Sequence, residues 1–320
     1  MLKRFHFIDH KKITLIVLAV VVVIGAGSLL LRGLNIDIEF SGGSELRVDM
    51  GAPVTKEICD KINDLIRNDS QLGHQYVSST TQASDDENTA IIRTGTKQLT
   101  NEQTMALRDA LTKEFPASRV DKVDSISPAI GDSLRSTMYI AVAVAVVLML
   151  IYIWIRFQLS SGLAAVVCLV HDLFVMLTIY SLFQIPINAT IIAAFLTILG
   201  YSINATIIVF DRVRENRVKY GSEKEFKDII NISVHETLAR SLNTTLTTLF
   251  TIGMIFIFGV ESIRNFAFPL IVGIVAGLFS SVFLSGLLWY TFSKLFDSRR
   301  KKETKSRKAV KPKAKAAGSK

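Results

Sequence analysis

The sequence predicts an α-helical polytopic membrane protein with six transmembrane helices and one α+β domain between helices 1 and 2. Hydrophobic residues make up 49% of the 320 residues, and the mean hydropathy is +0.37. This apolar content is gathered in six runs with few or no charges, each near the roughly 20 residues that a helix needs to cross the hydrocarbon core. The runs are 13–31, 137–155, 162–183, 189–210, 242–258 and 266–290.

The N-terminal region has a cleaved secretory signal peptide as its alternative interpretation, because four basic residues in 1–12 precede the first apolar run. That run ends with Leu30-Leu31 before Arg32 and has no small-x-small cleavage pattern after it. We therefore expect 1–12 to be a polar N-terminus and 13–31 to remain as the first transmembrane helix.

Basic residues predict the orientation, since loops rich in Lys and Arg stay in the cytoplasm. Segment 1–12 has four of them, 211–241 has seven, and the tail from Lys294 has twelve. In contrast, 33–133 has 10 Lys and Arg residues against 17 Asp and Glu residues. We therefore predict that both termini and 211–241 are cytoplasmic, and that 32–136 is external.

The net charge of +9 does not by itself predict a nucleic-acid partner. The cytoplasmic segments and the low-complexity basic tail, 291–320, account for the excess. We expect no nucleic-acid binding by a dedicated site. Anionic lipid and a ribosome are the two open alternatives for what the tail contacts, and each basic residue near a membrane surface contributes about 1 kcal/mol.

The external segment alternates the periodicities of strands and helices. The expected elements are strands at 44–50, 75–82, 89–94 and 119–126, a helix at 54–67, and a second helix that opens with a capping box at Thr100 and Gln103 and buries Met105, Leu107, Leu111 and Phe115. This β-α-β-β-α-β order is that of a ferredoxin-like split unit. Because the segment has no catalytic trio, phosphate loop or metal-ligand spacing, we expect a binding module without enzymatic activity, cofactor or metal.

One pair of titratable residues lies in the middle of an apolar run. His171 and Asp172 are about ten residues into the third run. Ionisable residues within a span cost about 2.5–3.5 kcal/mol on insertion scales, so they are candidates for function. Proton exchange and a purely structural hydrogen bond between helices are both open interpretations.

Spans four and five each carry a polar stripe at helical spacing. The stripes are Ala193, Thr197, Gly200 and Asn204 in one span, and Arg240, Thr244, Thr247, Thr248 and Thr251 in the other. Either stripe could serve helix packing or an ion pathway. Arg240 either points inward or extends to the cytoplasmic interface.

Two further patterns are interpreted as structural. Gly273, Gly277 and Ser281 form a close-packing face in span six. In 211–241, a cap at Ser222 and Glu225 predicts an amphipathic helix that lies on the membrane or against the bundle, with Phe226, Ile229, Ile230 and Ser233 on one face. The charged run 211–216 before it is either a solvated span boundary or a functional motif.

Several of these motifs together resemble the SecF half of the SecD/SecF family of bacterial protein-export proteins, within the resistance-nodulation-division group. The shared motifs are Gly200-Tyr201-Ser202-Ile203-Asn204, Phe210-Asp211-Arg212-Val213-Arg214-Glu215-Asn216, Phe40-Ser41-Gly42-Gly43, Ser127-Pro128-Ala129-Ile130-Gly131, His171-Asp172 and 259–266. The resemblance covers Ile13 to about Lys294.

The resemblance implies a subunit of the bacterial inner membrane that pairs with SecD and carries a periplasmic domain. It also implies binding of unfolded secretory polypeptide, use of the proton gradient to assist export through SecYEG, and a YidC-type insertase as a further partner. The family has a proton-coupling Asp directly after the span-four Asn, assisted by an Arg that Arg240 matches. This chain has Ala205 at the Asp position, and Asp37-Ile38-Glu39-Phe40 where the family has Gly-(Leu/Ile)-Asp-Phe.

Ala205 leaves several hypotheses open. An alanine has no titratable proton, so Ala205 is either an introduced change that disables coupling, or a natural one with the proton path through Asp172 or through the SecD half. A non-conducting scaffold is the hypothesis from another class. Half of a small-molecule efflux pump is a third, although such pumps have larger outer domains than this length can hold.

Overall fold

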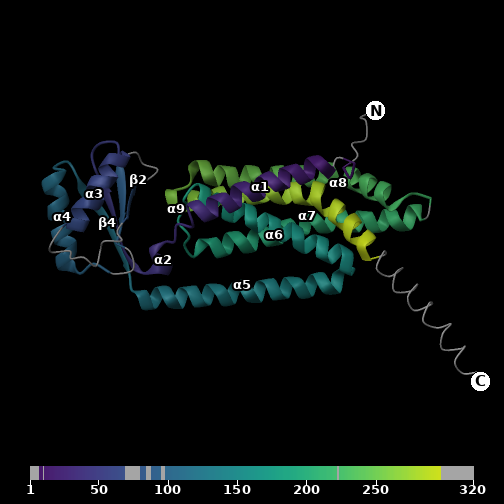
Figure 1. Ribbon diagram of the computed structural model, residues 1–320, viewed down its shortest axis with the longest axis horizontal. Coiled ribbons are helices and arrows are strands. Elements are labelled where there is room, and N and C mark those ends of the chain that lie inside the picture. Colours follow the sequence, from purple (N-terminus) through teal and green to yellow (C-terminus); the bar gives the residue numbers. More distant parts are fainter. Residues whose placement is uncertain are drawn as a thin grey trace, which may run out of the picture. The chain divides into compact units, whose positions relative to one another are not determined.

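The computed structural model describes residues 7–9, 11–68, 80–83, 88–94, 98–221 and 223–296. The chain divides into two compact units (Figure 1). The helical unit comprises Met1–Gly33, Ala145–Phe183 and Ala194–Lys320, and the α+β unit comprises Leu34–Val144 and Gln184–Ala193.

Six helices are long and apolar enough to cross a membrane. They are α1 (Lys11–Leu31), α5 (Pro128–Arg156), α6 (Leu159–Leu182), α7 (Thr190–Tyr220), α8 (Phe226–Phe258) and the sixth span (Ile263–Phe296), which includes most of α9 (Glu261–Phe279) and the π-helical turn η2 (Ser280–Leu284). Each predicted run falls within or largely within one of these helices, so the predicted polytopic helical membrane protein is confirmed.

The helices extend beyond the runs that predicted them. α5 begins at Pro128 rather than at 137, because the fixed φ of proline suits a first helical turn and the Ser127 hydroxyl accepts a hydrogen bond from Ile130 N (3.4 Å). Segment 211–241, expected to be a loop with one amphipathic helix, is helical up to Tyr220 and again from Phe226. Hydropathy marks only the part of a helix that suits lipid, so it assigned the polar ends to loops.

The start of α8 packs into the bundle. Ile229, Ile230 and Ser233 are buried, and the Phe226 ring lies 5.6 Å from the Trp289 ring, which in turn lies 4.8 Å from Phe210. The predicted apolar face therefore lies against the bundle. The expected cap residue Ser222 is outside the described residues, and the N-cap residue of α8 is Glu225, whose side chain makes no capping hydrogen bond.

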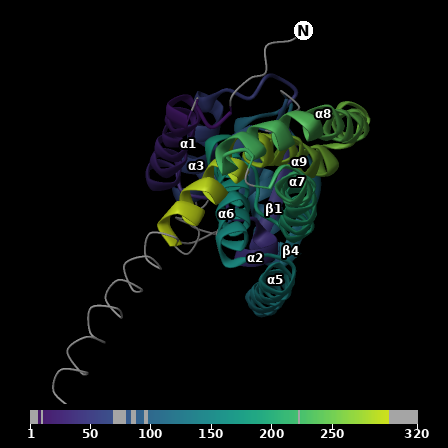
Figure 2. The same ribbon diagram turned by 90° about the vertical axis from the view of Figure 1, so that its right-hand side faces the viewer.

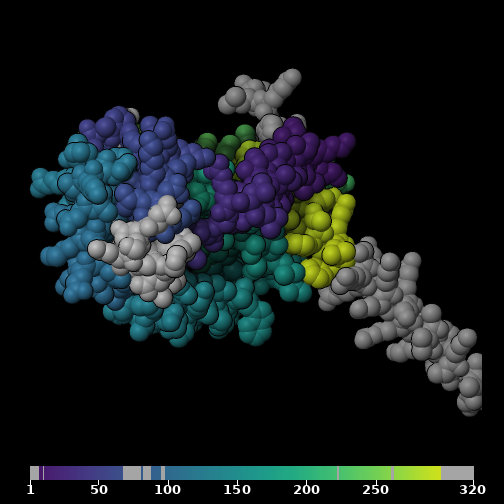
Figure 3. Space-filling view, turned by 60° about the vertical axis from the view of Figure 1, so that its left-hand side comes forward, coloured from purple at the N-terminus to yellow at the C-terminus, as the bar shows by residue number. Residues whose placement is uncertain are grey.

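Small residues bring the helices of the helical unit together, with α1 packed on α6 and both α6 and α8 packed on α9 (Figure 2). A Cβ at Gly25 would lie 2.3 Å from Thr178 Oγ1, and a Cβ at Gly273 would lie 2.8 Å from the Ile198 side chain. A side chain at Gly25 or at Gly273 would therefore force its neighbours to shift. Much of α1 lies at the surface (Figure 3). Its apolar side chains, such as Val23 and Leu31, are exposed, as expected of a helix in contact with lipid.

The α+β unit contains one antiparallel sheet. Its elements are α2 (Ile38–Ser41), β1 (Gly43–Asp49), α3 (Lys56–Asn68), β2 (Thr80–Ala83), β3 (Thr89–Arg93), α4 (Asn101–Glu114) and β4 (Arg119–Ile126). The strand order is β2-β3-β1-β4, and all neighbours are antiparallel. The predicted order of strands and helices from β1 to β4 is present. The first part of the strand expected at 75–82 lies outside the described residues.

Both longer helices cover one face of this sheet (Figure 1). Their apolar residues pack with those of β1 and β3 in a core of Leu46, Val48, Met50, Ile62, Ile66, Ala90, Ile92, Leu99, Leu107 and Leu111. The capping box of Thr100 and Gln103 opens α4 as predicted. Met105 is exposed instead of buried, because it lies two positions from Leu107 and so on another side of the helix.

Candidate functional site

A buried carboxylate lies at the centre of the helical unit. Asp172 on α6 is fully buried, and its Oδ1 lies 2.8 Å from His171 Nδ1. Its Oδ2 accepts hydrogen bonds from Ser280 Oγ (2.8 Å) and from Ser202 Oγ. We call these four residues, His171, Asp172, Ser202 and Ser280, the Asp172 cluster.

Three helices position this cluster. Ser202 comes from α7, and Ser280 is the first residue of η2. Gly277 faces the same cluster, since a Cβ there would lie in ordinary contact with Ser202 Cβ at 3.4 Å and with Asp172 Oδ2 at 3.7 Å. The close-packing role of Gly277 stays a prediction. π-helical turns are frequent at functional sites.

The cluster has the chemistry of a proton-exchange site. A carboxylate can take up and release a proton, and hydroxyl groups can both donate and accept hydrogen bonds. His171 is buried, and its Nε2 has no hydrogen-bond partner within the described part of the chain. A carboxylate, an imidazole and two hydroxyl groups are therefore in one chain of contacts inside a membrane-length bundle.

The predicted polar stripes do not join the Asp172 cluster. Gly200, Asn204, Arg240 and Thr244 are exposed, and Ala205 is half-buried. Asn204 follows Ser202 by two residues, about 200° around the helix, so Ser202 points inward and Asn204 outward. Among the described residues Arg240 has no ion pair, which fits an alanine at 205.

The stripe of span five nevertheless contacts α7 through Tyr201. Tyr201 Oη donates to the Thr244 carbonyl (2.9 Å) and lies 3.0 Å from Thr248 Oγ1. The Thr244 and Thr251 hydroxyls bond to carbonyls of their own helix, at Arg240 and Thr247. The Tyr201 contacts join α7 to α8 and support a packing role on this side.

The charged run 211–216 also connects helices. Arg156 at the end of α5 donates to both carboxylate oxygens of Asp211 (2.7 and 2.8 Å). Arg212 bonds to Glu215 on its own helix and to Glu236 on α8, both at 2.7 Å. Asn216 is buried and donates to the same Glu236 and to Ser233. The run therefore forms hydrogen bonds and ion pairs that join α7 to α5 and α8, and it is more than a solvated boundary.

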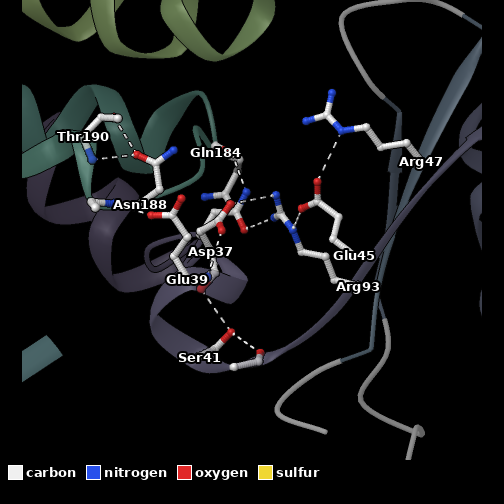
Figure 4. Close-up of polar contacts among 12 residues, drawn as sticks. Asp37, Glu39, Ser41, Glu45, Arg47, Arg93, Gln184, Asn188 and Thr190 are labelled. Carbon is white, nitrogen blue, oxygen red and sulfur yellow. Dashed lines mark hydrogen bonds and ion pairs between the residues drawn. The ribbon is translucent and has the colours of Figure 1, made fainter. Parts of the chain in front are cut away.

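A second polar centre lies in the α+β unit (Figure 4). Arg93 at the end of β3 donates to Glu45 Oε2 (2.9 Å) and to Asn35 Oδ1 (2.8 Å), and its Nη2 lies 3.6 Å from Asp37 Oδ2. The side chains of Arg93, Glu45 and Asp37 are largely buried. We call Asn35, Asp37, Glu45 and Arg93 the Arg93 cluster.

The motif Phe40-Ser41-Gly42-Gly43 follows directly. Phe40 is buried, and Gly42 has φ 70°, which a residue with a side chain rarely adopts. A Cβ at Gly42 would lie 2.9 Å from Pro128 Cα, and one at Gly131 would lie 2.9 Å from the Phe40 carbonyl. Glycine is therefore needed at these two positions, because the backbones of 40–43 and 127–131 are in contact there.

Burial raises the pKa of Asp37 above its ordinary value of 3.8, and this effect outweighs the hydrogen bond from Glu39 N and the charge of Arg93. A raised folded-state pKa means that the folded chain binds more protons, so this group's contribution to stability is lost as pH rises from 3.8 through the raised value. We expect Asp37→Asn, which keeps the acceptor for Glu39 N, to remove that pH dependence. Hydrogen exchange of β1 and β3 amides measures it.

The matched control is Asp49→Asn, since Asp49 Oδ1 also accepts a backbone hydrogen bond, from Gly51 N (2.9 Å). This control should keep the pH dependence of the unaltered chain. Equal slopes in Asp37→Asn and the unaltered chain would contradict the assignment to Asp37.

Sequence reasoning missed Ser202, Ser280 and Arg93 as site residues. Ser202 lies in the motif 200–204, in which Asn204 carries the larger polar side chain. Ser280 is the first residue of the π-helical turn η2, directly after the last residue of α9. Arg93 closes a predicted strand, and no local signal marks its partners, which are 48 to 58 residues away.

Known proteins match most of the chain. A family model described as protein export membrane protein SecD/SecF, C-terminal, matches residues 106–295. The protein translocase subunit SecF of Acidaminococcus fermentans is 37% identical over 295 residues, covering 92% of this chain and 99% of that relative. The SecF subunit of Sebaldella termitidis is 36% identical over 266 residues, covering 82% of this chain and 83% of the relative.

A solved structure has the same fold. The crystal structure of SecDF, a translocon-associated membrane protein from Thermus thermophilus, matches with a TM-score of 0.78 and 27% identity over 91% of this chain. The match spans 39% of the length of that longer chain. The chain therefore belongs to the SecF branch of the SecD/SecF family of protein-export membrane proteins.

Proposed function

We propose that this chain assists protein translocation across a bacterial inner membrane as the proton-coupled partner of SecD. In this proposal both termini are cytoplasmic, and the α+β unit is a ferredoxin-like periplasmic module, as its strand order supports. The observation that carries the proton step is Asp172, a fully buried carboxylate in a membrane-length helix with three hydrogen-bond partners. Intramembrane carboxylates of this kind mark ion pathways.

The exposed polar side of α7 and α8 supports the pairing with SecD. Asn204, Arg240, Thr244 and Thr247 are exposed on helices that are otherwise apolar enough for lipid. Polar groups that face lipid are costly, whereas a neighbouring protein can hydrogen-bond them. The relatives of this chain are SecF subunits, and the solved SecDF chain is more than twice the length of the match.

Unfolded polypeptide is the proposed substrate, and the α+β unit is its proposed binding module. β4 pairs only with β1 within the described sheet, so its other edge offers backbone groups to an extended chain. Delivery from SecYEG, and cooperation with a YidC-type insertase, belong to the same proposal.

The proton step is tested by export into sealed vesicles that contain this chain with its SecD partner. We expect Asp172→Asn to abolish the stimulation of export by a proton gradient, because the amide cannot release a proton while its size is unchanged. Ser181→Ala is the matched control, since Ser181 is a buried hydroxyl on the same helix that bonds to Ser28 (2.8 Å). The control should keep the stimulation.

Ala205 supports one alternative, a non-conducting scaffold. If stimulation by the gradient survives in the double variant Asp172→Asn, Arg240→Ala, the scaffold function is favoured. The proposed proton step in this chain is then wrong. Ala205→Asp should increase the stimulation if the outward face of α7 can also carry protons. An unchanged response would leave position 205 without a role here.

A further inference from the structure

A short segment that precedes α1 is inserted into the helical unit. Phe7 and Ile8 are only 6% and 4% exposed, although they lie close to the N-terminus. Ile8 N donates to Asn231 Oδ1 (3.1 Å) on α8, and Lys227 on the same helix forms an ion pair with Asp9. The segment therefore lies against the first turns of α8, within one compact unit.

A row of aromatic rings connects this segment with the Asp172 cluster. The Phe7 ring meets the Phe283 ring edge-on, with the two centroids 5.5 Å apart. Phe283 stacks on Phe279 at 5.4 Å, and Phe279 lies 5.9 Å from the His171 ring. Neighbouring rings at such distances are in contact, so apolar side chains occupy the path from Phe7 to His171.

His171 is the polar group at the inner end of this row. It is buried, and its Nε2 has no hydrogen-bond partner among the residues that the structure describes. A buried nitrogen is normally paired with a protein group or with an ordered water molecule. Water that reaches Nε2 can bond to it while Nδ1 keeps its contact with Asp172 (2.8 Å). His171 is thus the point at which water can enter the Asp172 cluster.

We infer that residues 7–9 form a plug that controls the access of water to His171 from the end of the helical unit at which α8 begins. Apolar constrictions close membrane pathways by excluding water. With the plug seated, the row of rings is continuous and Nε2 stays dry. When the plug leaves, Phe283 loses the ring that covers it, and water advances along Phe279.

The contacts of the plug suit a segment that can leave and return. Residues 7–9 precede α1, so their departure breaks no membrane-length helix. The side chains of Lys227 and Asp9 are 32% and 44% exposed, and ion pairs of this kind are weak. The inference rests on the proposed proton step at Asp172 for its purpose, because controlled entry of water serves a cluster that exchanges protons.

The first test measures the reactivity of Cys168, whose Sγ lies 3.8 Å from the carbonyl of Ser280 in the Asp172 cluster. With Cys59→Ala as background, Cys168 is the single thiol of the full chain. In detergent, we expect Phe7→Ala to raise the rate of its modification by a small, charged methanethiosulfonate at least about tenfold, as the loss of a buried ring predicts. Phe7→Leu keeps an apolar side chain of similar size, so its rate should stay within about twofold of the unaltered chain.

Phe183→Ala is the matched control. Phe183 also meets a ring of the sixth span edge-on, that of Phe268 at 5.2 Å, but Phe268 lies near the start of that span and about four turns before Phe283. The control should leave the Cys168 rate unchanged. An unchanged rate in Phe7→Ala, or an equal rise in Phe183→Ala, would overturn the plug.

The second test acts on the ion pair and leaves the buried side chains intact, so it stands even if Phe7→Ala impairs folding. Asp9→Lys places two cations side by side, and we expect it to raise the Cys168 rate about two- to fivefold. The double variant Asp9→Lys, Lys227→Asp restores opposite charges and should return the rate to that of the unaltered chain. No rise in the single variant, or no reversal in the double one, would also overturn the inference.

Both tests use the chain without SecD and without an export assay. If Asp172→Asn leaves the stimulation of export intact, the proposed proton step is wrong, while the Cys168 rates still decide whether residues 7–9 act as a plug. The two failures are therefore distinguishable.

Discussion

Arg93→Ala is expected to destabilise the α+β unit by about 3–5 kcal/mol, because it leaves the buried carboxylate of Asp37 without its cation and Glu45 with only the more exposed Arg47. The side chains of Glu45 and Asp37 are only 8% and 14% exposed. Arg93 also donates to Asn35, so the substitution removes that hydrogen bond as well. Urea unfolding followed by hydrogen exchange of β1 and β3 amides measures the loss.

Arg47→Ala is the matched control for that experiment. Arg47 also pairs with Glu45, at 3.4 Å, but its side chain is 34% exposed and has solvent as an alternative partner. Partly exposed ion pairs contribute about 1 kcal/mol or less. Equal losses in the two variants would mean that burial of the Arg93 cluster does not determine its contribution.

Gly25→Leu is expected to separate α1 from α6. The first atom of any side chain at Gly25 would lie 2.3 Å from Thr178 Oγ1 and 2.6 Å from the Phe174 ring. Overpacking of this kind costs about 1–3 kcal/mol when the neighbours can shift, and more when they cannot. A disulfide between Ser28→Cys and Ser181→Cys, at positions whose hydroxyls are 2.8 Å apart, reports the packing of the two helices. Its yield should fall sharply with Gly25→Leu.

Gly27→Leu provides the control, since a Cβ at Gly27 meets nothing within 4 Å. The two substitutions add the same side chain to the same helix two residues apart. A similar loss of disulfide in both would show that helix propensity or membrane insertion, rather than contact with α6, is responsible.

Much of the fold was predictable because its signals are local. Apolar runs long enough to cross a bilayer predicted all six helices, and alternating periods predicted the order of strands and helices in the α+β unit. The ends of the helices were not predictable in this way. The segment 211–220 is held by hydrogen bonds to distant residues, such as the one from Arg212 to Glu236, 24 residues away. Hydropathy carries no information about such bonds.

The candidate site was predicted only in part, since its partners come from distant elements. His171 and Asp172 were predictable because they are titratable residues within an apolar run. Ser202 and Ser280 did not, because a serine in a span is ordinary until the helices that carry it are placed. Sequence spacing left open whether Asn204 and Thr244 serve helix packing or an ion pathway, and α7 and α8 turn them outward.

Because the π-helical turn η2 contains one extra residue, it determines how the end of the sixth span is rotated about the helix axis. An ordinary α-turn holds one residue fewer, so conversion of η2 to that form would swivel everything after Leu284 by about 100° around the helix axis. Trp289, now 4.8 Å from the ring of Phe210, would swing away from it. Deleting one residue from 280–284 would thus rotate the whole C-terminal end of the sixth span, while the side chains before the turn keep their positions.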